Sequence, residues 1–175
     1  MASAALVVKG GTPAQAQALE SAYSAFPPAC RTDGTVCVCL LSDHSMDSCL
    51  QACAAAHSQK MVNPGAVDGF FDCASGVITL RDVSTTSDVS ATFAHEYGHF
   101  VWANILTPAQ RDRYGAIYRT QRSAHHLISQ YAAVSVQEGF AEAFSFYIRD
   151  QACLAKADPL SCVYLTSLLP PRKPA

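Results

Sequence analysis

The stretch His95-Glu96-Tyr97-Gly98-His99 (HEYGH) lies within an apolar segment that extends to about Asn104. Such a continuous apolar segment predicts a buried helix, for which Ser87 or Asp88 is a suitable N-cap. Two histidines four residues apart share one face of a helix, so both imidazoles can bind one tetrahedral ion. Glu96 then flanks the ion without binding it, and can take a proton from a metal-bound water, whose pKa zinc lowers to about 7.

Chance is a poor explanation of this pattern. The chain has six histidines and four glutamates in 175 residues. About one chain in two hundred of this composition would contain HExxH at random. Two histidines and a glutamate on a buried helix also need polar partners. The sequence therefore predicts one zinc ion per chain, with His95 and His99 as ligands.

A catalytic zinc keeps three protein ligands and one open position, so a third ligand is needed. The extended pattern HExxHxxGxxH is absent, because the chain has Trp102 and Ile105 where glycine and histidine would stand. A second apolar helix carries Glu138 and Glu142 in the segment EGFAEAF, and carboxylates on a buried face are costly unless they are paired or metal-bound. We expect Glu138 to bind zinc and Glu142 to accept a hydrogen bond from a ligating imidazole, which fixes its tautomer. The alternatives for the third ligand are His125 or His126, then Asp112 and Cys73.

These residues together resemble a known family. HEYGHF, Tyr131 and the segment EGFAEAF that begins seven residues later are similar to the catalytic domain of anthrax lethal factor and of the bacterial Pro-Pro endopeptidases, over about residues 76–148. The resemblance implies a zincin-like zinc endopeptidase in which Glu138 is the third ligand and Tyr131 points into the site to stabilise the oxyanion. By family analogy alone, it suggests prolines on both sides of the cut. Residues 1–75 and the cysteines show no such resemblance.

The pattern along the whole chain predicts an α+β fold. We expect an N-terminal lobe of about residues 1–85, with a small twisted sheet and helices, and a helical lobe of about residues 86–175. An active-site cleft would lie between them, in a single metallopeptidase domain of residues 1–175. In the N-terminal lobe we expect a helix capped by Thr12 and ending before Pro27, a strand Thr35–Leu41, a helix at 46–57, a turn at Asn63-Pro64-Gly65 and a hairpin at 69–73 and 76–80. In the helical lobe we expect helices from Ser87 or Asp88 to about Asn104, from Pro108 to Ser123, over 135–151 and near 159–169. A loop at 124–134 would join the second and third of these helices.

The segment GVITL (residues 76–80) alternates in the manner of a half-buried edge strand. It lies just before the HEYGH helix. Two interpretations stay open: the strand pairs with an extended peptide substrate, or it is an ordinary core strand.

Composition and charge limit the classes of molecule that the chain is expected to bind. Twelve basic and fourteen acidic residues give a net charge of −2, and the basic residues are scattered. This argues against a nucleic-acid or membrane surface and favours a peptide or protein substrate. No apolar run reaches the roughly 20 residues that a transmembrane helix needs, and residues 2–8 lack the basic start and the length of a secretory signal.

Eight cysteines, an even number, favour several disulfides and an oxidising compartment. We therefore expect a secreted protein or a delivered toxin domain, with Cys153 and Cys162 as a plausible bridge. One alternative is a structural zinc site from Cys37-x-Cys39 and Cys49-x-x-x-Cys53. Another is that several cysteines are free and pack as small apolar residues.

Two other functions fit parts of this pattern. A zinc amidase would act on a small amide, although the cysteine ligand sequence usual in deformylases is missing. A non-catalytic binding or toxin module would keep zinc only to stabilise its helices. Glu96 argues against that module, because a structural zinc site is usually closed by a fourth protein ligand and has no use for an unliganded carboxylate.

Overall fold

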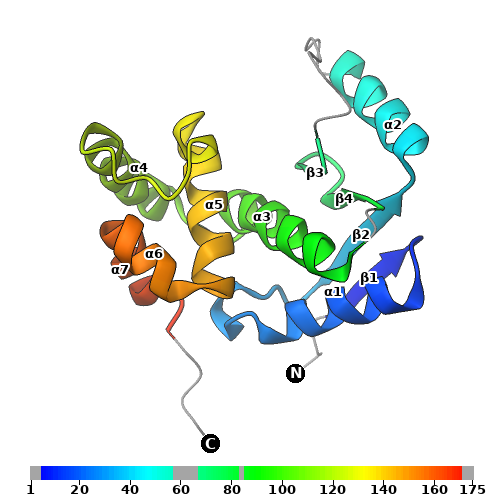
Figure 1. Cartoon of the computed structure of the whole chain (residues 1–175), viewed down its shortest axis with the longest axis horizontal. Helices are drawn as coiled ribbons and strands as arrows, with labels where there is room; N and C mark the ends of the chain where they lie inside the picture. The colour runs from blue at the N-terminus through cyan, green and yellow to red at the C-terminus, as the bar shows by residue number, and fades with distance from the viewer. Residues whose placement is uncertain (1–4, 57–66, 83–84, 171–175) are drawn as a thin grey trace, which may run out of the picture.

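The structure, a computed structural model, describes residues 5–56, 67–82 and 85–170. Within these ranges the chain forms an α+β fold with a four-stranded sheet in the order β1-β2-β4-β3 (Figure 1). β1 (Ala5–Lys9), β2 (Thr35–Leu41) and β4 (Val77–Arg81) are parallel, whereas β3 (Gly69–Asp72) pairs antiparallel with β4 and forms an edge. The α+β class expected from the sequence is confirmed.

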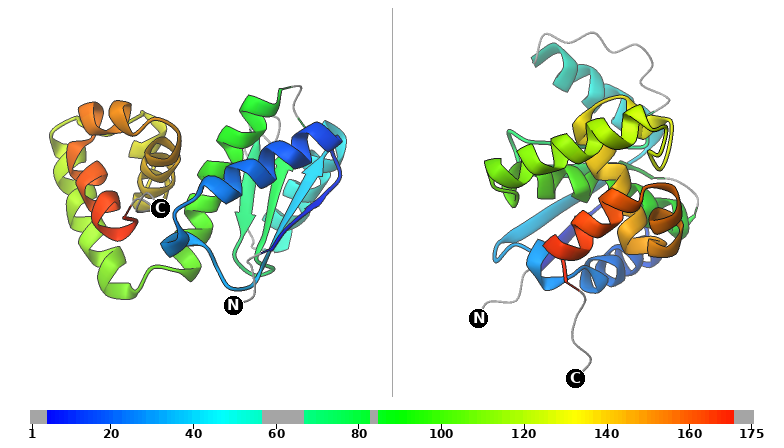
Figure 2. Two further views of the ribbon diagram at one scale, coloured as in Figure 1. Left: turned by 90° about the horizontal axis from the view of Figure 1, so that it is seen from below. Right: turned by 90° about the vertical axis from the view of Figure 1, so that its left-hand side faces the viewer.

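The helices surround the sheet and continue beyond it. α1 and α3 cover one face of the sheet and α2 lies on the other, while α4 to α7 form a group on the far side of α3 (Figure 2). The helices of the described residues are α1 (Pro13–Ala25), α2 (Asp43–Ala56), α3 (Thr86–Asn104), α4 (Pro108–Ser123), α5 (Val136–Arg149), α6 (Gln151–Ala157) and α7 (Pro159–Leu168), with the short 3-10 helices η1 (Pro28–Cys30) and η3 (Tyr131–Ala133).

Alternation along the strands explains this layering. Val36, Val38 and Leu40 of β2 point to one face and are buried in the main core, which contains residues of α1 and α3. On the opposite face, Arg81 of β4 is buried and pairs with two aspartates of α2, at 3.0 Å and 2.9 Å. The β2–β4 layer is therefore fixed by apolar packing on one side and by an ion-pair network on the other.

Helix α3 is the central element, because it contacts both the sheet and the helical group. The aromatic rings of Phe26, Phe93, Tyr97 and Phe144 pack together around it, with centroids 4.8 to 6.2 Å apart. The hydroxyl of Tyr97 also donates a hydrogen bond of 2.8 Å to the carbonyl oxygen of Cys30. The helix that carries HEYGH is thereby anchored from both sides.

Most elements lie where the sequence predicts them. The strand Thr35–Leu41, the helix that Thr12 caps, the helix Pro108–Ser123 and the hairpin of β3 and β4 are all confirmed. α2 begins at Asp43, three residues before its expected start, and α7 matches the short helix expected near 159–169. The expected turn at Asn63-Pro64-Gly65 lies outside the described residues.

Three details of the sequence prediction are wrong. GVITL is not an edge strand, because β4 lies between β2 and β3. The N-cap of α3 is Thr85, whose hydroxyl accepts the Asp88 N–H at 3.2 Å, rather than Ser87 or Asp88. The helix expected over 135–151 ends at Arg149, since the side chain of Asp150 caps α6, which was not predicted. Strand β1 was also not predicted.

The proposed bridge between Cys153 and Cys162 is absent, because both are free thiols. Cys153 is exposed on α6, whereas Cys162 is buried in α7. Cys30, Cys37, Cys39 and Cys73 are free thiols as well. Among the described residues, no helix is both long and apolar enough to cross a membrane.

Candidate metal centre

The site forms where α3 and α5 approach each other closely. A Cβ atom on Gly98 would lie 2.8 Å from the Cα of Ala141, a distance that real Cβ contacts essentially never reach. The glycine of HEYGH therefore permits a helix spacing that any other residue would widen. This contact brings the histidines of α3 against the glutamates of α5.

Three side chains converge at this junction. The Nε2 atoms of His95 and His99 lie 3.1 Å and 3.3 Å from Oε2 of Glu138. A tetrahedral ion with bonds of about 2.1 Å separates its ligand atoms by about 3.4 Å, so the spacing fits one zinc ion with little adjustment. Within the described residues, His95, His99 and Glu138 form the one group of three or more histidine, cysteine or carboxylate side chains whose ligand atoms are close enough to hold a metal ion.

Glu142, one turn after Glu138, orients the first histidine. Its Oε1 lies 2.9 Å from Nδ1 of His95, and its Oε2 accepts a 2.7 Å hydrogen bond from the hydroxyl of Ser129. When Nδ1–H donates to this carboxylate, the Nε2 lone pair of His95 is free for a metal. Ser129 was not predicted, since a lone serine in a loop carries no sequence signal.

The charges of the group are strongly coupled. Burial raises the pKa of Glu138, but hydrogen bonds from His95 and His99 outweigh it and lower that pKa to about 2. The pKa of Glu142 is lowered in the same way, by His95 and Ser129 against burial. Burial lowers the pKa of His95, yet the two carboxylates outweigh it and raise that pKa to about 10. Both carboxylates are thus ionised at neutral pH. Glu138 needs this charge to bind a metal ion, and Glu142 needs it to accept the hydrogen bond of His95.

Glu96 is placed differently from the other carboxylates. Only 6% of its surface is exposed, and burial raises its pKa while the two histidines lower it in part. The backbone of Phe71 in β3 forms a hydrogen bond with it, with the N–H donating to the carboxylate. Glu96 is not part of the ligand group. It is a carboxylate of raised pKa beside the three candidate ligands, as a general base requires.

Tyr131 begins η3, beside the same group. Its ring centroid lies 5.7 Å from that of His95, and 54% of its surface is exposed. Burial raises the pKa of its hydroxyl most, and the negative charges of the nearby Glu138, Glu96 and Glu142 raise it further, to about 12. The phenol therefore stays protonated at neutral pH and can donate a hydrogen bond.

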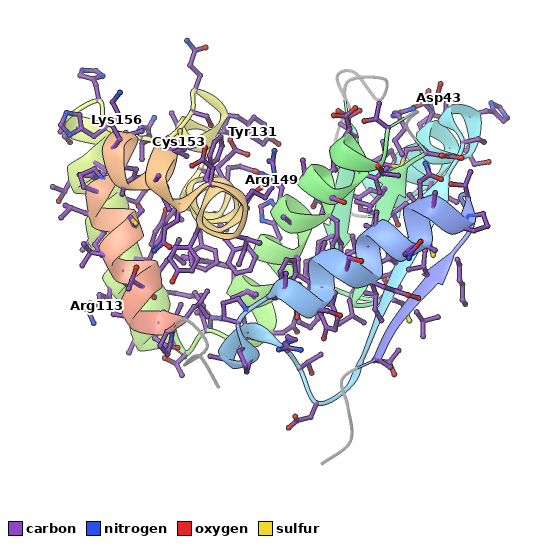
Figure 3. The ribbon with its side chains drawn as sticks, turned by 60° about the horizontal axis from the view of Figure 1, so that its bottom comes forward. Asp43, Arg113, Tyr131, Arg149, Cys153 and Lys156 are labelled. Carbon is purple, nitrogen blue, oxygen red and sulfur yellow. The ribbon has the colours of Figure 1, made fainter. Side chains whose placement is uncertain are left out.

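A cavity of about 320 Å³ opens beside these residues. Its walls come from the chain just before β3 and from α3, η3 and α5, and they include His95, Glu96, Tyr131 and Glu142. They also include Arg149, at the end of α5, a residue that no sequence pattern marks. Figure 3 shows Tyr131 and Arg149 toward the side of the helical group that faces α3. A ligand in this cavity would touch both the candidate base and the metal group.

The edge strand β3 meets this cavity at its first residue, Gly69. The Arg81 N–H bonds to the Asp68 carbonyl at 2.7 Å, so in this antiparallel pair the alternate residues Gly69 and Phe71 turn their N–H and C=O groups away from β4. Glu96 accepts a hydrogen bond from the Phe71 N–H. The other N–H and C=O groups of Gly69 and Phe71 point toward the side of β3 opposite β4. The peptide pairing considered for GVITL is therefore impossible for β4, which lies between β2 and β3, whereas β3 lies at the end of the sheet.

The alternative third ligands lie elsewhere. His125 has a positive φ of 56° in the turn after α4, and His126 follows it on the exposed side of that turn. Asp112 and Cys73 are exposed, on α4 and on the turn between β3 and β4. None of the four belongs to the group formed by His95, His99 and Glu138.

Comparison of the chain with protein-family models, curated proteins and solved structures finds no match.

Proposed function

We propose that this chain is a zinc-dependent endopeptidase. The observation that carries the proposal is the convergence of three ligand atoms beside a buried carboxylate that is not a ligand, at the wall of a cavity. Three protein ligands leave one coordination position open, as in catalytic zinc sites. In this proposal the sheet with α1 and α2 is one lobe of a zincin-like domain and α3 to α7 are the other, in keeping with the resemblance to lethal factor and the Pro-Pro endopeptidases.

The residues divide the work of peptide hydrolysis. When bound by His95, His99 and Glu138, zinc supplies a Lewis acid for the scissile carbonyl and lowers the pKa of the attacking water. Glu96 accepts the proton of that water and delivers it to the leaving amine. Tyr131 donates a hydrogen bond to the developing oxyanion, an interaction that is stronger in the transition state than in the substrate.

Support for a peptide substrate, rather than a small amide, comes from β3. An extended peptide can add to an open sheet edge through main-chain hydrogen bonds, with its side chains directed into neighbouring pockets. β3 borders the cavity, and a Cβ on Gly69 would lie 2.9 Å from the Cγ of Glu96. A peptide on this edge would pass directly over the candidate base.

The test is cleavage of a peptide library by the wild type and by Glu96→Gln, with zinc measured in both by elemental analysis. We expect one zinc per chain in each protein and a loss of turnover of about 10² to 10⁴-fold in the variant, because the amide cannot accept a proton. Glu20→Gln is the matched control, since Glu20 is exposed on α1. It should cleave like the wild type.

Other outcomes would replace the proposal. Bound zinc without cleavage of any peptide would indicate the non-catalytic module. Hydrolysis of small amides but not of peptides would indicate the amidase. Full activity of Glu96→Gln would show that Glu96 is not the base.

A further inference from the structure

We propose that Arg149 selects substrates with an acidic side chain among the first three residues after the cleaved bond. This inference rests on the proposed endopeptidase function and names the substrate class of that site.

Arg149 belongs to the same face of α5 as the metal group. At 100° per residue, Glu138, Glu142, Ser145 and Arg149 fall within about 60° of one another around the helix. Glu142, Ser145 and Arg149 all line the cavity. Seven residues separate Glu142 from Arg149, which is about 10 Å along the helix and about the length of three residues of an extended peptide. Among the α5 residues that line the cavity, Arg149 is therefore the one farthest along the helix from Glu138.

The guanidinium of Arg149 has no partner within the described part of the chain. It is exposed, and it forms no hydrogen bond or ion pair there. Two acidic groups of the cavity wall are engaged elsewhere: Glu142 with His95 and Ser129, and Glu96 with the Phe71 backbone. The third, Asp68, lies 3.9 Å from Arg81 with 64% of its side chain exposed, and it forms no ion pair with Arg149. A carboxylate from a substrate is thus the complement that this wall lacks.

When a peptide pairs antiparallel with β3, the direction of this strand decides which part of the peptide reaches Arg149. Gly69 lies against Thr92 and Glu96 at the cavity, whereas the ring of Phe71 lies 5.6 Å from that of Phe100, two turns further along α3 from Thr92. A peptide that pairs antiparallel with β3 runs in the opposite direction, from Phe71 toward Gly69. Its residues after the cut therefore enter the cavity that Arg149 borders.

The experiment starts from a peptide that the wild type cleaves. Glutamate or glutamine is placed at each of the first three positions after the cut, and kcat/KM is measured for each pair. At one position we expect the wild type to prefer glutamate by about 3- to 10-fold, as for a partly exposed charge pair. Arg149→Gln should lose this preference and Arg149→Lys should keep part of it. Lys156→Gln, which removes an exposed charge on α6, should behave like the wild type.

A binding measurement separates recognition from chemistry. The Glu96→Gln protein should bind the fluorescent glutamate peptide more tightly than the glutamine peptide by the same factor, and adding Arg149→Gln should abolish the difference. Thermal melts show whether each variant is folded.

The results that would contradict this inference can be told apart from those that would contradict the proposed endopeptidase function. If the wild type cleaves peptides but treats glutamate and glutamine alike at all three positions, the inference fails while the proposed function stands. If the preference instead follows a free C-terminal carboxylate and disappears in C-terminally amidated peptides, Arg149 binds the chain end and the side-chain proposal is overturned. If no peptide is cleaved, both proposals fail.

Discussion

Two places in the helical part of the molecule combine a carboxylate, a serine and a tyrosine, and they differ in what surrounds the carboxylate. At the junction of α3 and α5, Glu142 lies between His95 and Ser129, close to Tyr131. Where α7 packs against α4, a fully buried Asp158 accepts hydrogen bonds from the Gln121 side chain at 2.7 Å and the Ser161 N–H at 3.1 Å. The hydroxyl of Tyr114 lies 3.5 Å from that of Ser161.

Burial raises the pKa of the carboxylate in both places, but the partners decide the result. Imidazoles can carry a positive charge, so they outweigh burial and hold the pKa values of Glu138 and Glu142 low. Amide and hydroxyl donors are neutral, so the pKa of Asp158 stays raised. Asp158 caps α7 and ties it to α4, which is a structural task. A buried carboxylate is therefore evidence for a metal site only when its partners are also metal ligands.

The largest expected difference between the two places concerns their tyrosines. Tyr131→Phe should lower kcat by about 10² to 10³-fold, because it removes one hydrogen-bond donor to the oxyanion, and should leave zinc content and KM nearly unchanged. Tyr114→Phe removes a buried hydroxyl and should cost up to about 1.5 kcal/mol of unfolding free energy with kcat unchanged. Steady-state kinetics and urea unfolding measure both. A kcat of Tyr131→Phe within a few-fold of the wild-type value would show that Tyr131 packs beside the site and does not stabilise the oxyanion.

A smaller effect is expected on metal affinity. Glu142→Ala removes the acceptor that orients His95, so zinc affinity should fall by about 10- to 100-fold, as measured by competition with a chromophoric chelator. Asp158→Ala also removes a buried carboxylate, but it should leave zinc affinity unchanged and cost about 1 kcal/mol of stability through the lost helix cap. Equal zinc affinities in the two variants would show that Glu142 supports the metal no more than Asp158 does.

The smallest effect concerns the pH dependence of stability. Because the pKa of Asp158 is raised in the folded protein, the folded state holds this proton more tightly than the unfolded state, where the pKa is about 3.9. Its contribution to stability is present below pH 4 and is lost as pH rises through the folded pKa. Asp158→Asn keeps the cap and removes the titration, so its unfolding free energy relative to the wild type should increase over that interval. Parallel pH profiles from urea unfolding would show that Asp158 does not titrate in this way.

The sequence predicted which site residues share a helix face because the spacing within each pair is local. His95 and His99, like Glu138 and Glu142, are one helical turn apart, and a helix keeps such residues on one face in any fold. The contact of Glu138 with the two histidines is long-range, and it was expected from the cost of burying carboxylates and from the family resemblance. Ser129, Phe71 and Arg149 were missed because they reach the site through the loop before η3, the order of the strands and the full length of α5. The edge position of β3 could not be predicted from alternation, since the pattern of one strand does not state which neighbours pair with it.

Strand β1 was missed for a related reason. Its segment, ALVVK, is short and alternates between partial and full exposure, so its apolar residues carry a weak signal without the parallel partner β2. The N-cap of α3 was misplaced by two or three residues because Thr85, Ser87 and Asp88 are all good capping residues. Such choices depend on where the preceding chain leaves the sheet.

The edge strand β3 also bears on self-association. An exposed edge is a template for pairing with another molecule, and proteins limit this risk with short strands and charged residues. β3 has only four residues, and Glu96 already occupies the Phe71 N–H. Two copies of this edge in antiparallel register, centred on Phe70, would bring Asp68 of one copy opposite Asp72 of the other, and like charges in such cross-strand pairs repel. In this register the edge therefore disfavours pairing with its own copies through charge repulsion, which a foreign peptide without an acidic residue opposite Asp68 or Asp72 does not meet.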